Sequence, residues 1–247
     1  MSPESALPED LDSPDIRPGD KPDELVLFEH GFARLDSAMA DDLSVVNSAR
    51  VSFAVRREAM EERDEGLIRF LMRDRHGTPF EHNSFRFHLR TPIFVAREWM
   101  RHRLNSFNEE SSRYHKLADD FYVPSPTAVR SQVGKPGAYT FEPVDEALAR
   151  ETIETFQRVY KEFYEEYLSL LDKGVAKELA RSLLPVGIFT QFYWTVNARS
   201  LMNFLSLRNS EFAQYEIRTY AKAVERLFAA RMPATHRCFV EFERRAP

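Results

Sequence analysis

Apolar residues recur at helical spacing through the C-terminal half of the chain. Between Asp145 and Gly174, large apolar side chains fall three or four positions apart and predict one long helix that ends at the glycine. They are Phe156, Tyr160, Phe163, Tyr164, Tyr167, Leu170 and Leu171. A second stripe predicts a buried helix over about residues 211–230 and consists of Ile217, Tyr220, Ala221, Val224, Leu227 and Phe228.

Shorter helical segments are expected elsewhere. Their ranges are about 42–51, capped by Asp41 or Asp42, then 62–73, 91–101, 175–183, 197–207 and a last helix from Pro233. In the third of these, Thr91-Pro92 is the expected cap and first-turn pair.

Three segments have the β-branched, aromatic or alternating composition of strands, namely residues 25–27, 84–89 and 188–196. Several helices with few, scattered strands favour an α+β fold in one domain, over residues 25–247.

Three segments lack a regular apolar period. Residues 1–24 hold five prolines and an acidic excess, which predicts a flexible tail. Residues 103–113 are polar and are expected to form an ordered loop after the preceding helix. Residues 127–143 contain Gly134, Pro136 and Gly137 and are expected to form a mobile internal loop.

Composition narrows the class of protein. The chain of 247 residues is 43% apolar and 30% charged, as in globular proteins. Its net charge is −5, of which residues 1–25 hold −6, so the remaining body is nearly neutral and a general polyanion binder is disfavoured. No two glycines are spaced G-x-G, which excludes the usual dinucleotide fingerprint and the P-loop.

The single cysteine, Cys238, excludes an internal disulfide and a Cys-rich metal site, and it indicates a reducing compartment. There is no apolar run of about 18 residues and no signal-peptide pattern at the N-terminus. We therefore expect a cytoplasmic protein that does not interact with membranes. Cys238 lies beside Phe239 and Val240 and is interpreted as a core residue.

Arginine is the informative residue type. Arg97, Arg101, Arg103 and Arg113 lie within seventeen positions, separated by short donors and acceptors such as Asn105. Guanidinium groups bind phosphate bidentately and stack on flat rings, so this segment suits a ligand with a phosphate and a heterocycle. The alternative is a solvated helix end with surface ion pairs.

Arg181, Arg199 and Arg208 interrupt apolar helices. Either they meet an anionic or acceptor partner, because unpaired burial is costly, or they extend their head groups into water. His76, His82 and His88 recur every six residues, which is not a metal-binding helical pair. They are expected to be structural, with His76 kept as a ligand candidate.

The segment Arg101-His102-Arg103, followed by seven residues and then Ser111, carries a wider resemblance. Arg113-Tyr114 follows, and further blocks match in order at residues 42–53, 78–82, 92–97, 121–126 and 194–205. With these blocks the chain resembles the flavin-dependent thymidylate synthases from about residue 31 to residue 231.

The resemblance implies reductive methylation of dUMP to dTMP. The implied one-carbon donor is 5,10-methylenetetrahydrofolate, the hydride carrier is FAD, and the reductant is NADPH. It also implies a mixed fold of long helices with an antiparallel or mixed sheet. The implied assembly is a homotetramer whose sites are shared between subunits. No nucleic acid or metal is implied.

The resemblance also implies site residues. The implied cofactor contacts are Thr78, Arg101, His102, Arg103, Glu109, Asn197, Ala198, Arg199 and Asn203, with His76 on the flavin or folate side. The implied substrate contacts are Glu98, Trp99, Met100, Arg101, Glu109, Glu110, Ser111, Ser112, Arg113, Arg181 and Arg208. Arg208 is the implied catalytic residue, which stabilises negative charge on the uracil ring.

Three alternatives stay open. The arginine-rich segment suits a nucleotide- or RNA-binding module without catalysis, although a nearly neutral body disfavours it. A different flavin enzyme, such as an NADPH oxidase that does not need dUMP, is the second. Ser111 is assigned to dUMP binding against a role as nucleophile. Two departures from the family pattern are Glu98, where some relatives have Gln, and Phe212, where a relative has His.

Overall fold

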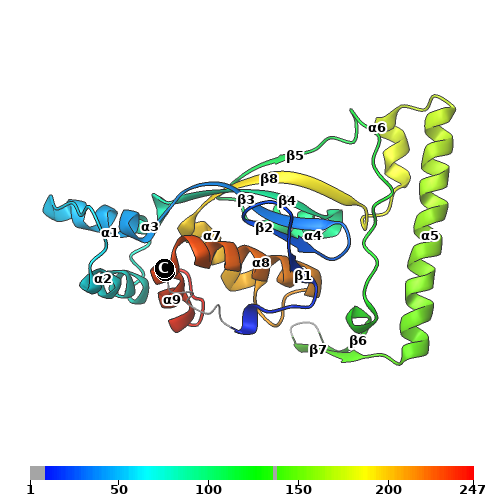
Figure 1. Ribbon diagram of the computed structural model, residues 1–247. Helices are drawn as coiled ribbons and strands as arrows, with labels where there is room; N and C mark the ends of the chain where they lie inside the picture. Colours follow the sequence, from blue (N-terminus) through cyan, green and yellow to red (C-terminus); the bar gives the residue numbers. More distant parts are fainter. Residues whose placement is uncertain (1–8, 136–137) are drawn as a thin grey trace. The chain divides into compact units, whose positions relative to one another are not determined.

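The computed structural model describes residues 9–135 and 138–247. The chain folds into two compact units, each built from segments that are separated in sequence (Figure 1). Unit 1 contains the described residues up to Arg90, together with Glu98–Asn108 and Phe192–Pro247, and unit 2 contains Thr91–Arg97 and Glu109–Gln191. Because the chain passes between the units four times, no single cut separates them.

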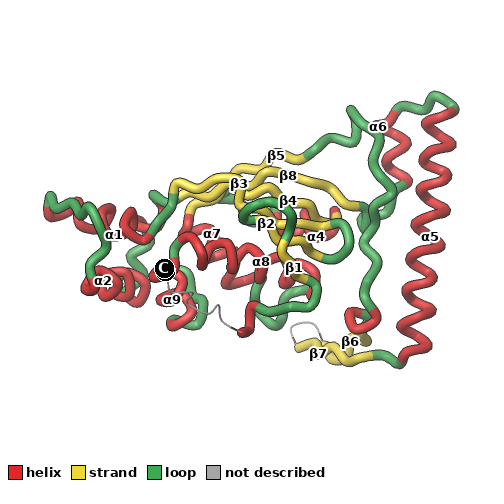
Figure 2. The backbone as a smooth tube through the Cα atoms, in the orientation of Figure 1, coloured by secondary structure: helices red, strands yellow, loops and turns green. Residues whose placement is uncertain are grey.

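A six-stranded sheet forms most of the β-structure of the chain, and Figure 2 shows its strands in yellow. Its strand order is β1 (Ile16–Pro18), β2 (Glu24–Leu27), β3 (Gly31–Met39), β4 (Ser84–Pro92), β8 (Phe189–Asn197) and β5 (Ser106–Glu109). The first four strands pair antiparallel, and the register of β3 against β4 shifts between Leu35 and Ser37. The fold is therefore mixed α+β with an antiparallel sheet. The boundary between the units falls within β4, β8 and β5.

The helices of unit 1 bury their apolar faces in an aromatic core. They are α1 (Asp42–Arg50), α2 (Glu62–Arg73), α3 (Thr78–Glu81), α7 (Ala198–Arg208), α8 (Tyr215–Arg231) and α9 (Pro233–Glu241). The whole predicted stripe of α8 is buried. Trp99, Trp194 and Phe204 pack ring against ring, with centroids 4.5 Å apart for Trp99 and Phe204 and 5.0 Å apart for Trp194 and Phe204. Burial of side chains this large supplies much of the stabilisation of a domain.

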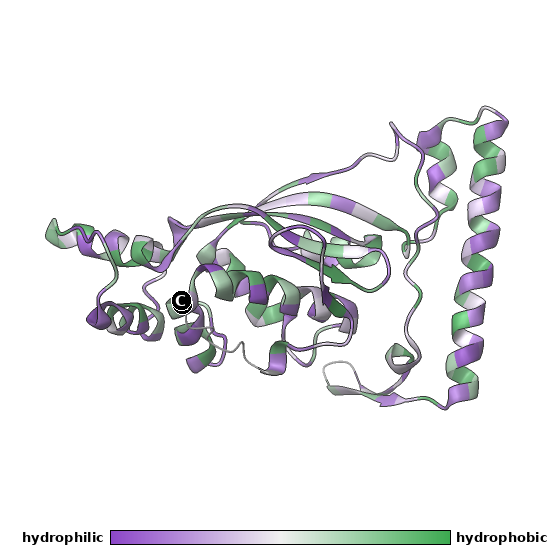
Figure 3. Cartoon of the chain, in the orientation of Figure 1, coloured by the Kyte–Doolittle hydropathy of each residue, from purple (hydrophilic) through white to green (hydrophobic). Residues whose placement is uncertain are grey.

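Unit 2 contains the long helix α5 (Glu146–Asp172), the short helix α6 (Lys177–Ala180) and a hairpin of β6 (Arg130–Lys135) and β7 (Ala138–Pro143). Asp145 caps α5 by accepting a hydrogen bond from the backbone N–H of Leu148 at 2.9 Å. Figure 3 shows hydrophobic and hydrophilic residues alternating along α5. Of the predicted stripe, Tyr167 is fully buried within this chain, whereas Phe163 is 39% exposed. The helix was predicted correctly, but its apolar face is only partly covered.

Helix α4 (Ile93–Trp99) begins two residues later and ends two residues earlier than expected. Thr91 and Pro92 are the last residues of β4 instead of a helix cap. The segment expected as a loop over 103–113 includes strand β5. These errors share a cause, because pairing in a sheet is decided by residues distant in sequence.

The flexible tail expected over residues 1–24 is wrong for residues 9–24, and residues 1–8 lie outside the described part of the chain. Leu11 is buried, and Arg226 on α8 donates two hydrogen bonds to its carbonyl oxygen at 2.7 and 3.1 Å. Ile16 is buried as well and belongs to β1, which pairs with β2. Composition alone does not reveal these tertiary partners.

The loop expected over residues 127–143 is also wrong, because the described residues of that segment include both strands of the β6–β7 hairpin. Residues 136 and 137 are outside the described part of the chain. Gly134 has φ +108°, a conformation that favours glycine. Over the residues described, no helix combines the length and apolar character needed to cross a membrane.

Candidate functional site

A cavity of about 1170 Å³ in unit 1 gathers many of the candidate ligand residues. Its lining consists of Arg75, Glu81, Arg101, His102, Arg103, Leu104, Asn105, Asn197, Arg199, Ser200, Asn203, Leu207, Arg208, Ala246 and Pro247. Seven of these were expected in the site from the sequence: Arg101, His102, Arg103, Asn197, Arg199, Asn203 and Arg208. Its volume is slightly larger than the range of about 300–1,000 Å³ that is usual for small-molecule sites.

Helix α7 supplies one wall because it is amphipathic. Asn197 caps it by accepting a hydrogen bond from the backbone N–H of Ser200 at 2.8 Å. Arg199, Asn203 and Arg208 lie on the side that lines the cavity. The opposite side is buried in the core and consists of Leu201, Met202, Phe204 and Leu205. The core therefore fixes the orientation of the polar side.

The second wall follows α4 directly. Trp99, at the end of α4, is fully buried, and its carbonyl oxygen accepts a hydrogen bond from the backbone N–H of His102 at 3.1 Å. Arg101 and Arg103 are exposed on either side of His102. The buried tryptophan thus holds the arginine segment at the cavity.

The cavity carries a clear excess of positive charge. Five arginine side chains line it against one acidic side chain, that of Glu81. Within residues 9–135 and 138–247, the guanidinium groups of Arg75, Arg101 and Arg103 have neither a hydrogen bond nor an ion pair. Unpaired guanidinium groups in a concave site favour an anionic ligand.

Arg199 is held by three neighbours. Its Nη1 donates to Glu81 at 2.5 Å, and its Nε donates to the carbonyl oxygen of Pro247 at 2.9 Å. Gly77 lies directly beneath it, because a Cβ atom at that position would come within 2.4 Å of the Arg199 Nε. A larger residue at position 77 would therefore displace the outer part of the Arg199 side chain from this position.

Arg208 donates hydrogen bonds from all three of its guanidinium nitrogens. Its Nη1 donates to the Glu98 carboxylate at 3.1 Å, its Nη2 to the Glu98 carbonyl oxygen at 3.3 Å, and its Nε to His102 Nε2 at 3.1 Å. Burial, with the nearby charge of Arg208, lowers the pKa of His102 to about 4. His102 is therefore neutral at physiological pH and acts as an acceptor at Nε2.

A second set of candidate residues lies in unit 2, where each polar side chain already has a protein partner. Glu110 accepts hydrogen bonds from the backbone N–H and the Nε2 of Gln191 at 3.0 and 3.2 Å. Glu109 accepts one from Thr190 at 2.7 Å. His115 also lies 3.2 Å from the Glu110 carboxylate. These contacts attach the C-terminal part of the arginine-rich segment to β8.

The other candidate residues of unit 2 connect α6, and the residues that follow it, to the arginine-rich segment. Arg181 Nη1 donates to the Ser112 hydroxyl at 2.9 Å, and its Nε donates to the Glu178 carbonyl oxygen at 3.3 Å. Arg113 forms an ion pair with the Glu178 carboxylate at 3.3 Å. Ser111 accepts a long hydrogen bond, 3.4 Å, from the backbone N–H of Arg113.

Several sequence candidates are not in the cavity lining. His76 is exposed and stacks on Phe70, with centroids 5.5 Å apart. Ala198 is buried and donates its backbone N–H to Asn83 at 2.9 Å. Trp99 contributes its indole to the core, so it supports the site from behind instead of offering a side chain to a ligand. Thr78 and Met100 also lie outside the lining.

Other lining residues were missed from the sequence. Glu81 lies within the matching block 78–82 and Arg75 lies three residues before it, so their position in the sequence was a usable signal. Ser200 and Leu207 lie three positions before and four positions after the candidate Asn203, so helical spacing could have found them. Ala246 and Pro247 carry no local signal, because their place at the cavity depends on the fold.

Two other residues singled out from the sequence, His88 and Cys238, have surroundings that indicate a structural role. His88 Nδ1 lies 2.7 Å from a guanidinium nitrogen of Arg34, and its ring stacks on Tyr193. Cys238 is buried as predicted, and burial raises the pKa of its thiol to about 11. In the described part of the chain, no group of three or more His, Cys, Asp or Glu side chains is placed to hold a metal ion.

Comparison with known proteins identifies relatives over nearly the whole chain. The family model described as "Thymidylate synthase complementing protein" matches residues 34–234. Proteins named flavin-dependent thymidylate synthase include one from Thermosipho africanus, 44% identical over 89% of this chain and 95% of the relative, and one from Tropheryma whipplei, 45% identical over 84% and 91%.

A solved structure is similar over most of the chain. The UMP/dUMP methylase PolB from Streptomyces cacaoi, bound with 5-Br UMP, has a TM-score of 0.81 and 43% sequence identity. The match covers 88% of this chain and 97% of that one.

Proposed function

The chain belongs to the flavin-dependent thymidylate synthase family, and from that membership we propose that it converts dUMP to dTMP by reductive methylation. In this proposal 5,10-methylenetetrahydrofolate supplies the one-carbon unit, FAD carries the hydride and NADPH reduces the flavin. The observation on which the proposal chiefly rests is the arginine-lined cavity of unit 1, with three guanidinium groups that no described residue neutralises.

The donor set of this cavity fits FAD. A flavin dinucleotide has a pyrophosphate, ribityl hydroxyls and the polar edge of a flat ring. Arg101 and Arg103 offer charge to the pyrophosphate, and Asn197 and Asn203 offer amide groups that both donate and accept. Without a glycine-rich loop, side-chain guanidinium groups take the place of backbone amides in neutralising phosphate.

FAD, when bound, supplies hydride-transfer chemistry, and the chain supplies binding and electrostatics. We assign to Arg208 the stabilisation of negative charge that develops on the uracil ring. Glu98 and His102 hold its guanidinium group in one orientation, so little reorganisation is needed during the reaction. His102, neutral because of its low pKa, accepts a hydrogen bond from Arg208 without adding a competing positive charge.

The residues of unit 2 are assigned to dUMP. Arg181 and Arg113 supply positive charge for a phosphate, and Ser111 and Ser112 supply hydroxyl groups. Ser111 is assigned to binding, not to nucleophilic attack, because its Oγ has no described histidine or carboxylate partner. The partly covered face of α5 fits assembly into the proposed homotetramer, and the buried Cys238 fits a reducing cytoplasm.

The experiment is an anaerobic reaction of the purified protein with FAD, NADPH, dUMP and 5,10-methylenetetrahydrofolate, analysed for dTMP by chromatography. We expect dTMP, and we expect it to disappear when FAD is omitted from stripped protein. In a parallel reaction in air, oxidation of NADPH by oxygen through the flavin, at a rate that dUMP and folate do not change, would indicate an oxidase instead. A protein that neither copurifies with nor binds flavin would indicate a binding module.

UMP is a second candidate substrate. PolB, whose name includes both UMP and dUMP, is 43% identical to this chain, nearly the same as the curated thymidylate synthases at 44%. Identity alone therefore does not separate the two substrates. Parallel reactions with UMP and dUMP test this point, and we expect dUMP to have the higher kcat/KM.

A further inference from the structure

Arg75 has a backbone conformation that arginine rarely adopts. It follows α2 and has φ +60°, in the left-handed region. The backbone N–H of Arg75 donates to Met72 at 3.3 Å, and that of His76 donates to Leu71 at 2.9 Å. This pair of hydrogen bonds defines a helix end at which the left-handed residue is usually glycine, because a Cβ atom is disfavoured there. The chain therefore keeps a large side chain at a cost in conformational energy.

The side chain of Arg75 lines two cavities. One is the main cavity of unit 1, and the other, of about 450 Å³, is lined by Met72, Arg73, Arg75, Glu241, Phe242, Glu243 and Arg245. Arg73 is neutralised by Asp74 through two hydrogen bonds of 2.8 and 3.0 Å, and Arg245 pairs with Glu243 at 2.7 Å. The guanidinium group of Arg75, in contrast, has no partner among the residues described.

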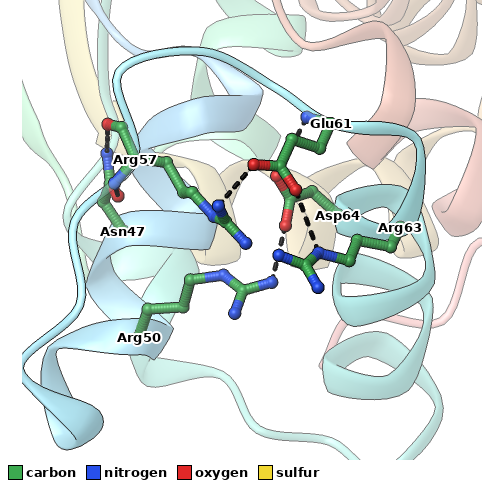
Figure 4. Close-up of polar contacts among 6 residues, drawn as sticks. All are labelled: Asn47, Arg50, Arg57, Glu61, Arg63 and Asp64. Carbon is green, nitrogen blue, oxygen red and sulfur yellow. Dashed lines mark hydrogen bonds and ion pairs between the residues drawn. The ribbon is translucent and has the colours of Figure 1, made fainter.

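The helix that presents Arg75 is firmly held at its other end. Figure 4 shows Arg50 reaching Asp64 and Arg57 reaching Glu61, with Arg63 on the other side of Glu61. Asp64 is fully buried. Burial opposes its ionisation, but hydrogen bonds from the Glu61 backbone and Arg50 outweigh it and lower its pKa. The backbone of Arg75 is therefore set by a helix with a fixed N-terminus.

We propose that Arg75 binds a phosphate group of a nucleotide in the main cavity, and that this contact explains an arginine where the helix end favours glycine. The proposal rests on the proposed function for the identity of the nucleotide. The same phosphate chemistry is present in FAD, dUMP and NADPH, so each is an arm of the test. The competing explanation is structural, since a cation near the C-terminus of α2 interacts favourably with the helix dipole.

Substitution by glycine separates these explanations, because glycine suits the backbone and lacks the charge. We expect Arg75→Gly to unfold at the same or a higher temperature than the wild type, and to bind one of the three nucleotides about tenfold more weakly, as loss of a charge-assisted hydrogen bond predicts. Arg75→Lys should keep most of the affinity. Arg75→Asn, which also tolerates the left-handed conformation, should repeat the loss.

The measurements are thermal unfolding without ligand and titration of flavin-stripped protein with FAD, dUMP and NADPH in turn, followed by intrinsic or flavin fluorescence. Arg245→Ala is the matched control, because it removes an arginine from the second cavity alone, and its affinities should equal those of the wild type. Affinities of Arg75→Gly within twofold of wild type for all three nucleotides would overturn the proposal, whatever its stability.

Inorganic pyrophosphate, followed by its effect on the unfolding temperature, keeps this test separate from the test of the enzyme activity. If the wild type makes no dTMP but pyrophosphate stabilises it more than it stabilises Arg75→Gly, the activity proposal fails and the Arg75 site stands. If the wild type makes dTMP, but Arg75→Gly and the wild type respond equally to pyrophosphate and to all three nucleotides, the activity proposal stands and the Arg75 proposal fails.

Discussion

The two groups of arginines in this chain differ in how their charge is neutralised. In the cavity of unit 1, Arg75, Arg101 and Arg103 have no partner among the described residues. In unit 2, Arg181 donates to Ser112 and Arg113 pairs with Glu178. Charge without a protein partner is available to a ligand at no cost in lost protein contacts, whereas charge that is already paired also contributes to the fold.

This difference separates binding from stability. Arginines of the first kind should affect ligand affinity with little effect on unfolding. Arginines of the second kind should affect both properties. Arg208 is intermediate, because it lines the cavity yet has three protein acceptors, and its role in the proposed reaction is electrostatic.

The largest effect is expected at Arg208. Arg208→Ala should lower kcat by about 100-fold or more, the usual cost of removing a group that stabilises charge in the transition state. FAD affinity should change by only a few-fold, because other arginines remain in the cavity. Single-turnover dTMP formation and the flavin absorbance of the purified variant measure the two quantities. Turnover equal to that of the wild type would exclude this role.

Arg101 and Arg181 test the comparison directly. Arg101→Ala should weaken nucleotide binding by about 10- to 100-fold, as expected for one charged hydrogen bond, and leave the free energy of unfolding unchanged. Arg181→Ala should weaken dUMP binding by a similar factor and also lower the free energy of unfolding by about 1 kcal/mol, because Ser112 and the Glu178 carbonyl lose a donor. Denaturant unfolding and ligand titration of both variants are required, and equal stability losses would contradict the comparison.

Gly77→Ala is expected to act through Arg199. The added Cβ atom would overlap the outer part of that side chain, which can rotate away, so the loss of stability should stay below about 1 kcal/mol. The displaced guanidinium group should weaken FAD binding by about tenfold. An unchanged FAD affinity would show that the position of Arg199 is not important for the ligand.

Ser111→Ala is expected to have a small effect. The loss of one neutral hydrogen bond should raise KM for dUMP by about threefold to tenfold while turnover remains measurable. Steady-state kinetics in dUMP checks this. Complete loss of turnover in a folded, flavin-loaded variant would favour the nucleophile role that we rejected.

A further prediction concerns the pH dependence of stability, and not the binding or turnover of a ligand. The pKa of His102 is lowered from 6.5 to about 4, so between these values the unfolded chain binds a proton that the folded chain does not. The free energy of unfolding should therefore decrease as the pH falls from 6.5 to 4. His102→Gln removes this contribution, and its stability should decrease less over the same range. Parallel slopes from denaturant unfolding at several pH values would be inconsistent with a neutral, partly buried His102.

The sequence predicted most of the elements that depend on local patterns. The range of α2, the start of α5 next to Asp145 and the buried stripe of α8 are as expected. The predictions that failed were those that depend on distant partners. The order of residues 9–24 depends on Arg226, and the end of β4 at Pro92 depends on sheet pairing.

The same division applies to the site. Arg101, Arg199 and Arg208 could be selected as residue types that suit anions, and the structure places all three at one cavity. The partners that hold them, including Gly77 and the Pro247 carbonyl, could not, because nothing local marks a contact between residues so far apart. The unusual backbone of Arg75 is likewise visible only in three dimensions.

The central claim is that the unpaired arginines of unit 1 bind the flavin nucleotide. Its most direct test is titration of flavin-stripped wild type, Arg103→Ala and Arg113→Ala with FAD, followed by flavin fluorescence. Our account predicts that Arg103→Ala binds FAD at least about tenfold more weakly than the wild type and that Arg113→Ala binds it equally well. Equal affinities for all three proteins, or a loss confined to Arg113→Ala, would contradict it.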